Sequence, residues 1–161
     1  SNKALSDATK ADVWEDLGEL LFLSEDEAGA AICIKEAEKL IPAEYHIVPD
    51  EKGTQPNDVR EYFAPLAKLE MLKGQMAFDG KARDPQAGLR HYLLAYAYFN
   101  LFSTEAVQAE QLIDYLYRRL RDLPYETQRT LITEAEAWLD ENEIGVDLGR
   151  FLQNLHALLG V

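Results

Sequence analysis

The sequence predicts an all-α protein of about seven helices. Apolar residues recur every three or four positions through most of the 161 residues, which is the period of one helix face. No segment shows the sustained alternation of apolar and polar residues that is typical of a strand. Proline, glycine and serine separate the periodic segments, and the separations are mostly short. Short connections favour antiparallel neighbours, so we expect stacked helical hairpins.

The first hairpin is expected to contain helices from about Ala8 to Leu23 and from about Asp26 to Ile41. Ser24 and Glu27 have the spacing of a capping box, which predicts that Ser24 caps the second helix. Pro42 ends that helix because its ring cannot be accommodated in a further helical turn.

Eight positions of this hairpin follow one spaced pattern, W-x2-L-G-x2-Y, then A-x3-F, a further A and a closing P. They are occupied by Trp14, Leu17, Gly18, Leu21, Ala30, Ile34, Ala37 and Pro42. Only Leu21 and Ile34 depart from the pattern, and both keep an apolar side chain. Residues 11–44 therefore resemble a tetratricopeptide repeat. The resemblance implies a right-handed superhelical array of hairpins; an ordinary hairpin that matches by chance is the alternative.

Five more helices are expected, over residues 59–79, 85–102, 104–122, 124–143 and 147–161. Pro65 predicts either a kink or a helix that starts near Ala64. Asp84 is expected to cap the helix that begins at Pro85. Apolar residues of the last helix, Leu148 to Leu159, form one stripe.

The expected domain covers residues 8–161, after a polar segment of residues 1–7 whose first two residues we interpret as a cloning remnant. Residues 60–102 resemble a degenerate second repeat, with Gly74 and Gly88 as close contacts between its helices. Residues 104–161 are expected to supply further helices and a C-terminal cap. Residues 43–58 are expected to form a long loop, which serves either as a spacer or as a binding element.

Charge and composition exclude several classes of function. The formal net charge is −13, which disfavours binding to a phosphate backbone. No apolar run is long enough to span a membrane. Cys33 is the only cysteine, so no internal disulfide is possible, and we expect a packed thiol in a reducing compartment, the cytoplasm.

Catalysis finds no support in the sequence. It contains no phosphate-binding loop of the G-x-x-x-x-G-K-[ST] type, no H-E-x-x-H pair and no G-x-S-x-G elbow. The three histidines, His46, His91 and His156, are far apart and lack ligand spacing. Asp140, Asn142 and Gly145 begin like a calcium loop, but later ligand positions carry apolar residues. We therefore expect no enzyme activity, no cofactor and no metal.

The resemblance to tetratricopeptide repeats also implies a concave groove, lined by the first helix of each hairpin. The expected partner-binding residues are Asp12, Glu15, Glu19 and Phe22 on one helix and Lys68, Met71, Gln75 and Phe78 on the other. Acids at three of these positions favour a basic or mixed peptide over an acidic one. The alternative is that these acids form an ordinary solvated surface.

These observations predict a non-catalytic module for protein interaction or sensing. The segments LIPAEYHIVP, KLEMLKGQMAF and DYLYRRLRDLP are together similar to repeat regions of bacterial signalling ATPases of the STAND type. That resemblance implies the principal alternative, a regulatory domain of such an ATPase that binds a small ligand between its helices. A third alternative is a homo-oligomerisation unit that pairs through the apolar stripe of the last helix.

Overall fold

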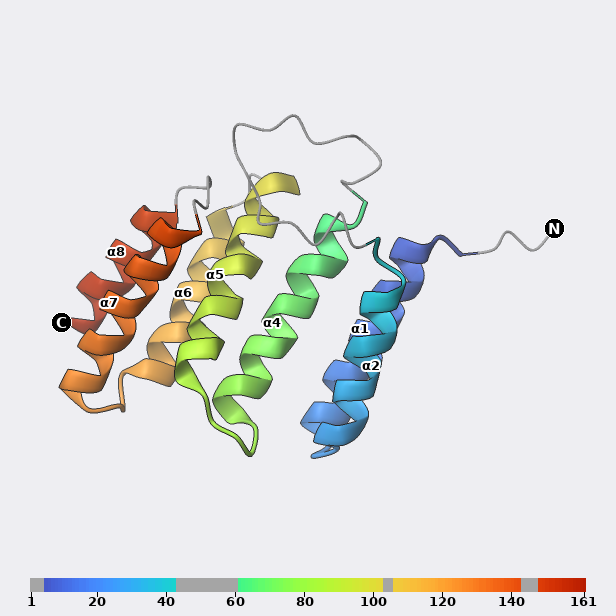
Figure 1. Cartoon of the computed structure of the whole chain (residues 1–161), viewed down its shortest axis with the longest axis horizontal. Coiled ribbons are helices and arrows are strands. Elements are labelled where there is room, and N and C mark those ends of the chain that lie inside the picture. Colours follow the sequence, from blue (N-terminus) through green and yellow to red (C-terminus); the bar gives the residue numbers. More distant parts are fainter. Residues whose placement is uncertain (1–4, 43–60, 103–105, 143–147) are drawn as a thin grey trace.

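The structure is a computed structural model that describes residues 5–42, 61–102, 106–142 and 148–161. Every regular element in these ranges is a helix, and the prediction of an all-α fold with seven helices is confirmed. The helices lie side by side along the length of the molecule, with α1 and α2 at one end and α7 and α8 at the other (Figure 1). Their bounds are α1 Asp7–Leu23, α2 Glu27–Lys39, α4 Phe63–Asp79, α5 Pro85–Phe102, α6 Ala106–Leu120, α7 Tyr125–Glu141 and α8 Leu148–Leu159.

The first hairpin, α1–α2, is built around small residues. A Cβ atom on Gly18 would lie 3.1 Å from Leu72 Cδ2 and 3.2 Å from Cys33 Cβ, so the bare backbone at this position lets three helices meet. Ala30 is fully buried beside it, and Cys33 is a buried free thiol, as predicted. The loss of helix propensity at Gly18, about 1 kcal/mol, is thus offset by close packing.

The turn between α1 and α2 differs from the predicted capping box. Asp26, rather than Ser24, caps α2, because its Oδ1 accepts a hydrogen bond from Gly29 N at 2.9 Å. Ser24 instead ends α1, and Glu25 follows with a φ of 68°. Asp26 N donates to Leu21 O at 2.8 Å, which completes a Schellman motif. The left-handed residue of this motif shifts the cap by two positions.

The buried face of α1 does not include every apolar position of the spaced pattern. Leu17 is 43% exposed, whereas Ala8, Ala11 and Glu15 are buried. The reason is that α1 packs against α4 as well as α2, so its buried face points between these two helices.

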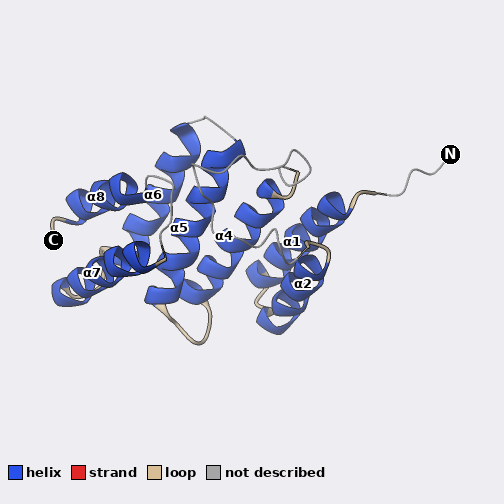
Figure 2. Ribbon diagram, turned by 45° about the horizontal axis from the view of Figure 1, so that its top comes forward, coloured by secondary structure: helices blue, strands red, loops and turns tan. Residues whose placement is uncertain are grey.

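The second hairpin, α4–α5, forms the centre of the molecule (Figure 2). Helix α4 begins at Phe63, which places Pro65 in the first turn, where its missing N–H costs little. Asp84 caps α5 as predicted, since its Oδ1 accepts a hydrogen bond from Ala87 N at 3.1 Å. A Cβ on Gly74 would lie 2.5 Å from the Tyr92 ring, which confirms Gly74 as the close contact.

The last three helices pack on the far side of α5. Helix α8 contacts α6 and α7, and α5 contacts all three. In a regular repeat array each hairpin contacts only its neighbours, so this end is closer to a four-helix bundle than to a continuing stack. The apolar stripe of α8 supplies much of this core, with Leu148, Phe151, Leu152 and Leu155 all buried. Pairing of two chains through that stripe would therefore require α8 to leave the core.

Two hydrophobic cores result. One joins α1, α2 and α4 to Tyr98 of α5, and the other joins α5 to α6, α7 and α8. The α4–α5 hairpin contributes to both and holds the two halves together.

Several predictions lie outside the described residues. These are the long loop of residues 43–58, the N-terminal segment up to residue 4, the proposed start of the fifth helix at 103–105 and the segment 143–147. Among the helices that are described, none is long and apolar enough to cross a membrane.

Candidate partner-binding groove

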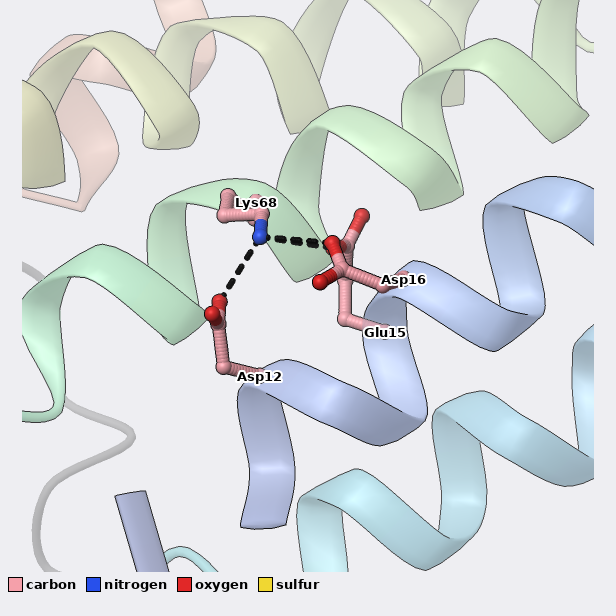
Figure 3. A network of polar contacts seen from close by, with 4 residues as sticks. All are labelled: Asp12, Glu15, Asp16 and Lys68. Carbon is pink, nitrogen blue, oxygen red and sulfur yellow. Dashed lines mark hydrogen bonds and ion pairs between the residues drawn. The ribbon is translucent and has the colours of Figure 1, made fainter. Parts of the chain in front are cut away.

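A charged cluster joins α1 to α4 (Figure 3). Lys68 of α4 places its Nζ 2.8 Å from Asp12 Oδ1 and 2.8 Å from Asp16 Oδ1. The two acids are one helical turn apart on α1, so they share a face and can bind one ammonium group between them. Burial opposes the charge of Lys68, but the hydrogen bonds to Asp12 and Asp16 outweigh it and raise the pKa of Lys68.

Glu15 lies in the same cluster but is buried, with only 3% of its surface exposed. Its Oε2 forms an ion pair with Lys68 Nζ at 3.3 Å, longer than the two 2.8 Å hydrogen bonds that Lys68 donates to Asp12 and Asp16. Burial raises the pKa of Glu15 to about 7 despite the opposing attraction of Lys68. The hydrogen bond from Lys68 instead holds the pKa of Asp16 below its ordinary value.

A small cavity of about 140 Å³ opens beside this cluster. Glu15 and Glu19 of α1 line one side of it, and α4 and α5 supply the rest: Lys68, Met71, Leu72, Gln75 and Tyr92. An apolar cavity of about 150 Å³ can hold one benzene-sized molecule. The cavity therefore has room for about one side chain.

A second cavity of about 300 Å³ lies between α4, α5 and α6, lined by Met71, Phe99, Gln111, Leu112 and Tyr115. Met71 lines both cavities, so they adjoin each other along α4. We call this combined surface the α4 groove. It is lined by α1, α4 and α6, with Tyr92 and Phe99 of α5 between them.

The predicted site residues divide into two groups. Five of the eight line the same cavity in the α4 groove: Glu15, Glu19, Lys68, Met71 and Gln75. Asp12 lies just beside them, bonded to Lys68.

The two phenylalanines are placed differently from expectation. Phe78 is partly buried and packs against Gly88 and Tyr92, so it belongs to the core. Phe22 lines a separate cavity of about 520 Å³ formed by the two hairpin turns. Neither ring lines the two cavities of the α4 groove; Met71 and the Tyr115 ring line it instead.

Asp16, Tyr92 and Tyr115 also contribute to the groove or to the cluster beside it, and the repeat pattern did not indicate them as groove residues. Tyr115 stacks on Tyr92 with ring centroids 4.6 Å apart. Arg119 lies over the Tyr115 ring at 4.1 Å and forms two 2.9 Å hydrogen bonds to Asp79. These contacts fix α6 against the end of α4. Arg119 therefore has an intramolecular role.

Metal binding and catalysis can be tested against the same geometry. Asp12, Glu15 and Asp16 are close enough together to ligate one ion. The Lys68 ammonium already lies against all three of these carboxyl groups, so a metal would have to displace it. His91 is paired with Glu70 through a 2.7 Å contact between Nδ1 and Oε2, which fits a structural role. No nucleophile–base pair occurs among the described residues that line the groove.

No protein-family model matches the sequence, and neither the curated proteins nor the solved structures contain a significant match. The interpretation as a tetratricopeptide-like array rests on the spaced pattern of residues 11–44 and on the side-by-side hairpins α1–α2 and α4–α5.

Proposed function

We propose that the protein is a non-catalytic interaction module that binds a peptide segment of a partner protein in the α4 groove. The observation that carries the proposal is the adjacency of two cavities that share Met71, on a surface to which α1, α4 and α6 all contribute. The helices on either side are fixed by the Lys68 cluster and by the Asp79–Arg119 pair. Because the groove is already formed before binding, little conformational entropy of the protein is lost when a peptide binds.

The resemblance to repeat regions of STAND-type ATPases extends this proposal. In such a context the groove would sense a peptide on behalf of a fused nucleotide-binding module in the cytoplasm.

A peptide library displayed on phage tests the proposal. The immobilised protein should select peptides whose affinity falls at least about tenfold in the Met71→Lys variant, because the substitution changes the residue common to both cavities. Glu136→Lys, on the exposed face of α7, is the matched control and should leave affinity unchanged. Circular dichroism melts would establish that both variants are folded.

Peptides that bind both variants and the wild type equally would place the site elsewhere. Failure to select any peptide above background would refute peptide binding altogether.

A further inference from the structure

We propose that the protein forms a symmetric dimer in which an apolar stripe on the outer face of α1 packs against the same stripe of a second copy. The stripe consists of Val13, Leu17 and Leu20, and we call it the outer α1 stripe. The proposal goes beyond peptide binding and does not depend on it, because none of these three residues lines the α4 groove.

The outer α1 stripe exposes large apolar side chains to solvent. Val13, Leu17 and Leu20 are between 43% and 62% exposed. Their spacing of four and three places them on one side of α1, opposite the face that this helix buries against α2 and α4. Single exposed apolar side chains are common, but four of the eight large ones among the described residues belong to α1. This helix is therefore apolar on two opposite faces, as is typical of a helix that is covered on both sides.

The equivalent side of α4 is covered by another hairpin. When the two hairpins are aligned on their packing glycines, the outer α1 stripe corresponds to three α4 residues, Leu69, Lys73 and Met76. Leu69 lies in the core that joins α1 and α2 to α4, and Met76 packs against that core. Lys73 forms an ion pair with Glu38 of α2 at 3.5 Å. The outer α1 stripe thus occupies the positions at which the second hairpin receives the helices of the first.

A second copy of the chain offers a surface that fits the stripe, namely the stripe itself. With Lys10 added, its residues recur at intervals of three, four and three, which is the spacing of a seam between two helices. In an antiparallel pair centred on Leu17, Val13 of one copy lies opposite Leu20 of the other. Such a contact uses the same surface twice and closes after two copies.

The charges at the ends of the stripe favour this antiparallel arrangement. Lys10 lies at the start of the stripe, and Glu25 lies just beyond its end. Both side chains are exposed, and neither forms an ion pair within the described residues. An antiparallel pair brings Lys10 of each copy toward Glu25 of the other, whereas a parallel pair would bring like charges together. Asp16, the acid nearest the middle of the stripe, is already bound by Lys68, which limits repulsion between the copies.

The interface is small, so we expect a dimer that dissociates readily. Stable complexes bury about 800 Å² on each partner, and the outer α1 stripe covers only part of one 17-residue helix. The expected dissociation constant is on the order of 10 μM. Since the α4 groove stays outside the contact, the dimer would carry two grooves and bind a partner with two copies of its peptide more tightly than one with a single copy.

Sedimentation equilibrium tests the dimer at protein concentrations from about 1 to about 500 μM, a range that brackets the expected dissociation constant. The average mass of the wild type should rise from 18.2 kDa toward twice that value. Leu20→Asp should weaken the dimer at least about tenfold, because it places a carboxylate in the apolar seam. Leu158→Asp, at a comparably exposed leucine of α8, is the matched control and should dimerise like the wild type. Circular dichroism melts would establish that both variants are folded.

Disulfide cross-linking tests the arrangement without removing charge balance from the stripe. Leu17→Cys should give a covalent dimer under mild oxidation, because its two copies meet near the two-fold axis. Val13→Cys should remain uncross-linked, since its two copies would lie about 12 Å apart along the helix axes. The native Cys33 is buried and should not interfere.

A wild type that stays at 18.2 kDa throughout the concentration range would overturn the proposal. A dimer that persists in Leu20→Asp but is lost in Leu158→Asp would also overturn it, because the contact would then lie at α8. Equal cross-linking of Val13→Cys and Leu17→Cys would refute the antiparallel arrangement.

Discussion

Replacement of Glu15 by glutamine should make the protein more stable at high pH and leave it nearly unchanged at low pH. The folded-state pKa of Glu15 is raised to about 7, from a usual value of 4.5. Between these values the folded chain holds a proton that the unfolded chain has released, so the stability of the wild type falls as the pH rises through this window. Glutamine does not ionise, so the variant escapes this loss.

The magnitude follows from the shift. At about 1.36 kcal/mol per pKa unit the full shift would be worth roughly 3 kcal/mol. The carboxyl group borders a cavity that admits water, and screening reduces the expected gain to about 1–2 kcal/mol at pH 8. For a chain of this size that corresponds to roughly 2–8 °C in Tm.

Urea denaturation followed by the fluorescence of Trp14 and Trp138, at pH 5 and pH 8, measures the effect. The difference in unfolding free energy between Glu15→Gln and wild type should grow by about 1–2 kcal/mol from pH 5 to pH 8. Glu136→Gln, an exposed residue of α7, serves as the control for removal of one charge. A difference that is the same at both pH values would refute the argument that burial of Glu15 dominates the attraction of Lys68.

Two further substitutions and one measurement of thiol reactivity test the packing. Glu25→Gly should raise the unfolding free energy by about 0.5–1 kcal/mol, because Glu25 has a φ of 68° that glycine adopts without strain. Glu25→Ala should give no such gain. A lower unfolding free energy in Glu25→Gly would contradict the assignment of backbone strain to Glu25. Gly74→Ala should lower the unfolding free energy by about 1–3 kcal/mol although alanine has the better helix propensity, since the new Cβ would lie 2.5 Å from the buried Tyr92 ring. An unchanged free energy in urea denaturation would show that the ring can move. Cys33 should react with a thiol reagent at least about a hundredfold faster in urea than in the folded protein, because the thiol is buried and its pKa is raised by that burial. A rapid reaction without urea would place the thiol at the surface.

The sequence predicted helices α6 and α8 well because each of them buries a continuous apolar stripe. Leu112, Leu116 and Leu120 of α6 recur at intervals of four, and all three are buried. The four residues Leu148, Phe151, Leu152 and Leu155 of α8 behave in the same way. In these helices the apolar residues recur with the helical period because one face is buried, so the periodicity in the sequence predicts which residues are buried.

The turn between α1 and α2 shows where local patterns fail. Ser24 and Asp26 are both good capping residues, and the sequence favoured Ser24 because Glu27 completes its box. The outcome depends on Glu25, which adopts a left-handed conformation that is unusual for a residue with a side chain. Glu27 is then freed from the cap and accepts a 3.2 Å hydrogen bond from Lys81 N in the next hairpin turn. This contact between two hairpins competes with the local capping box. It cannot be predicted from the residues of the turn alone.

Glu15 shows the same limit at the candidate site. The spacing of Asp12, Glu15 and Glu19 correctly predicts that they lie near one another on α1, because helix geometry alone decides that. Which of them is buried depends on how α1 crosses α4, and that crossing is set by Gly18 against Leu72. Close approach at Gly18 brings Lys68 within reach of Asp12 and Asp16 and encloses Glu15 between the helices. The burial of Glu15, and with it the raised pKa of its carboxyl group, therefore depends on the close contact between α1 and α4 that Gly18 makes possible. A larger residue at position 18 should separate the two helices and expose Glu15 to solvent.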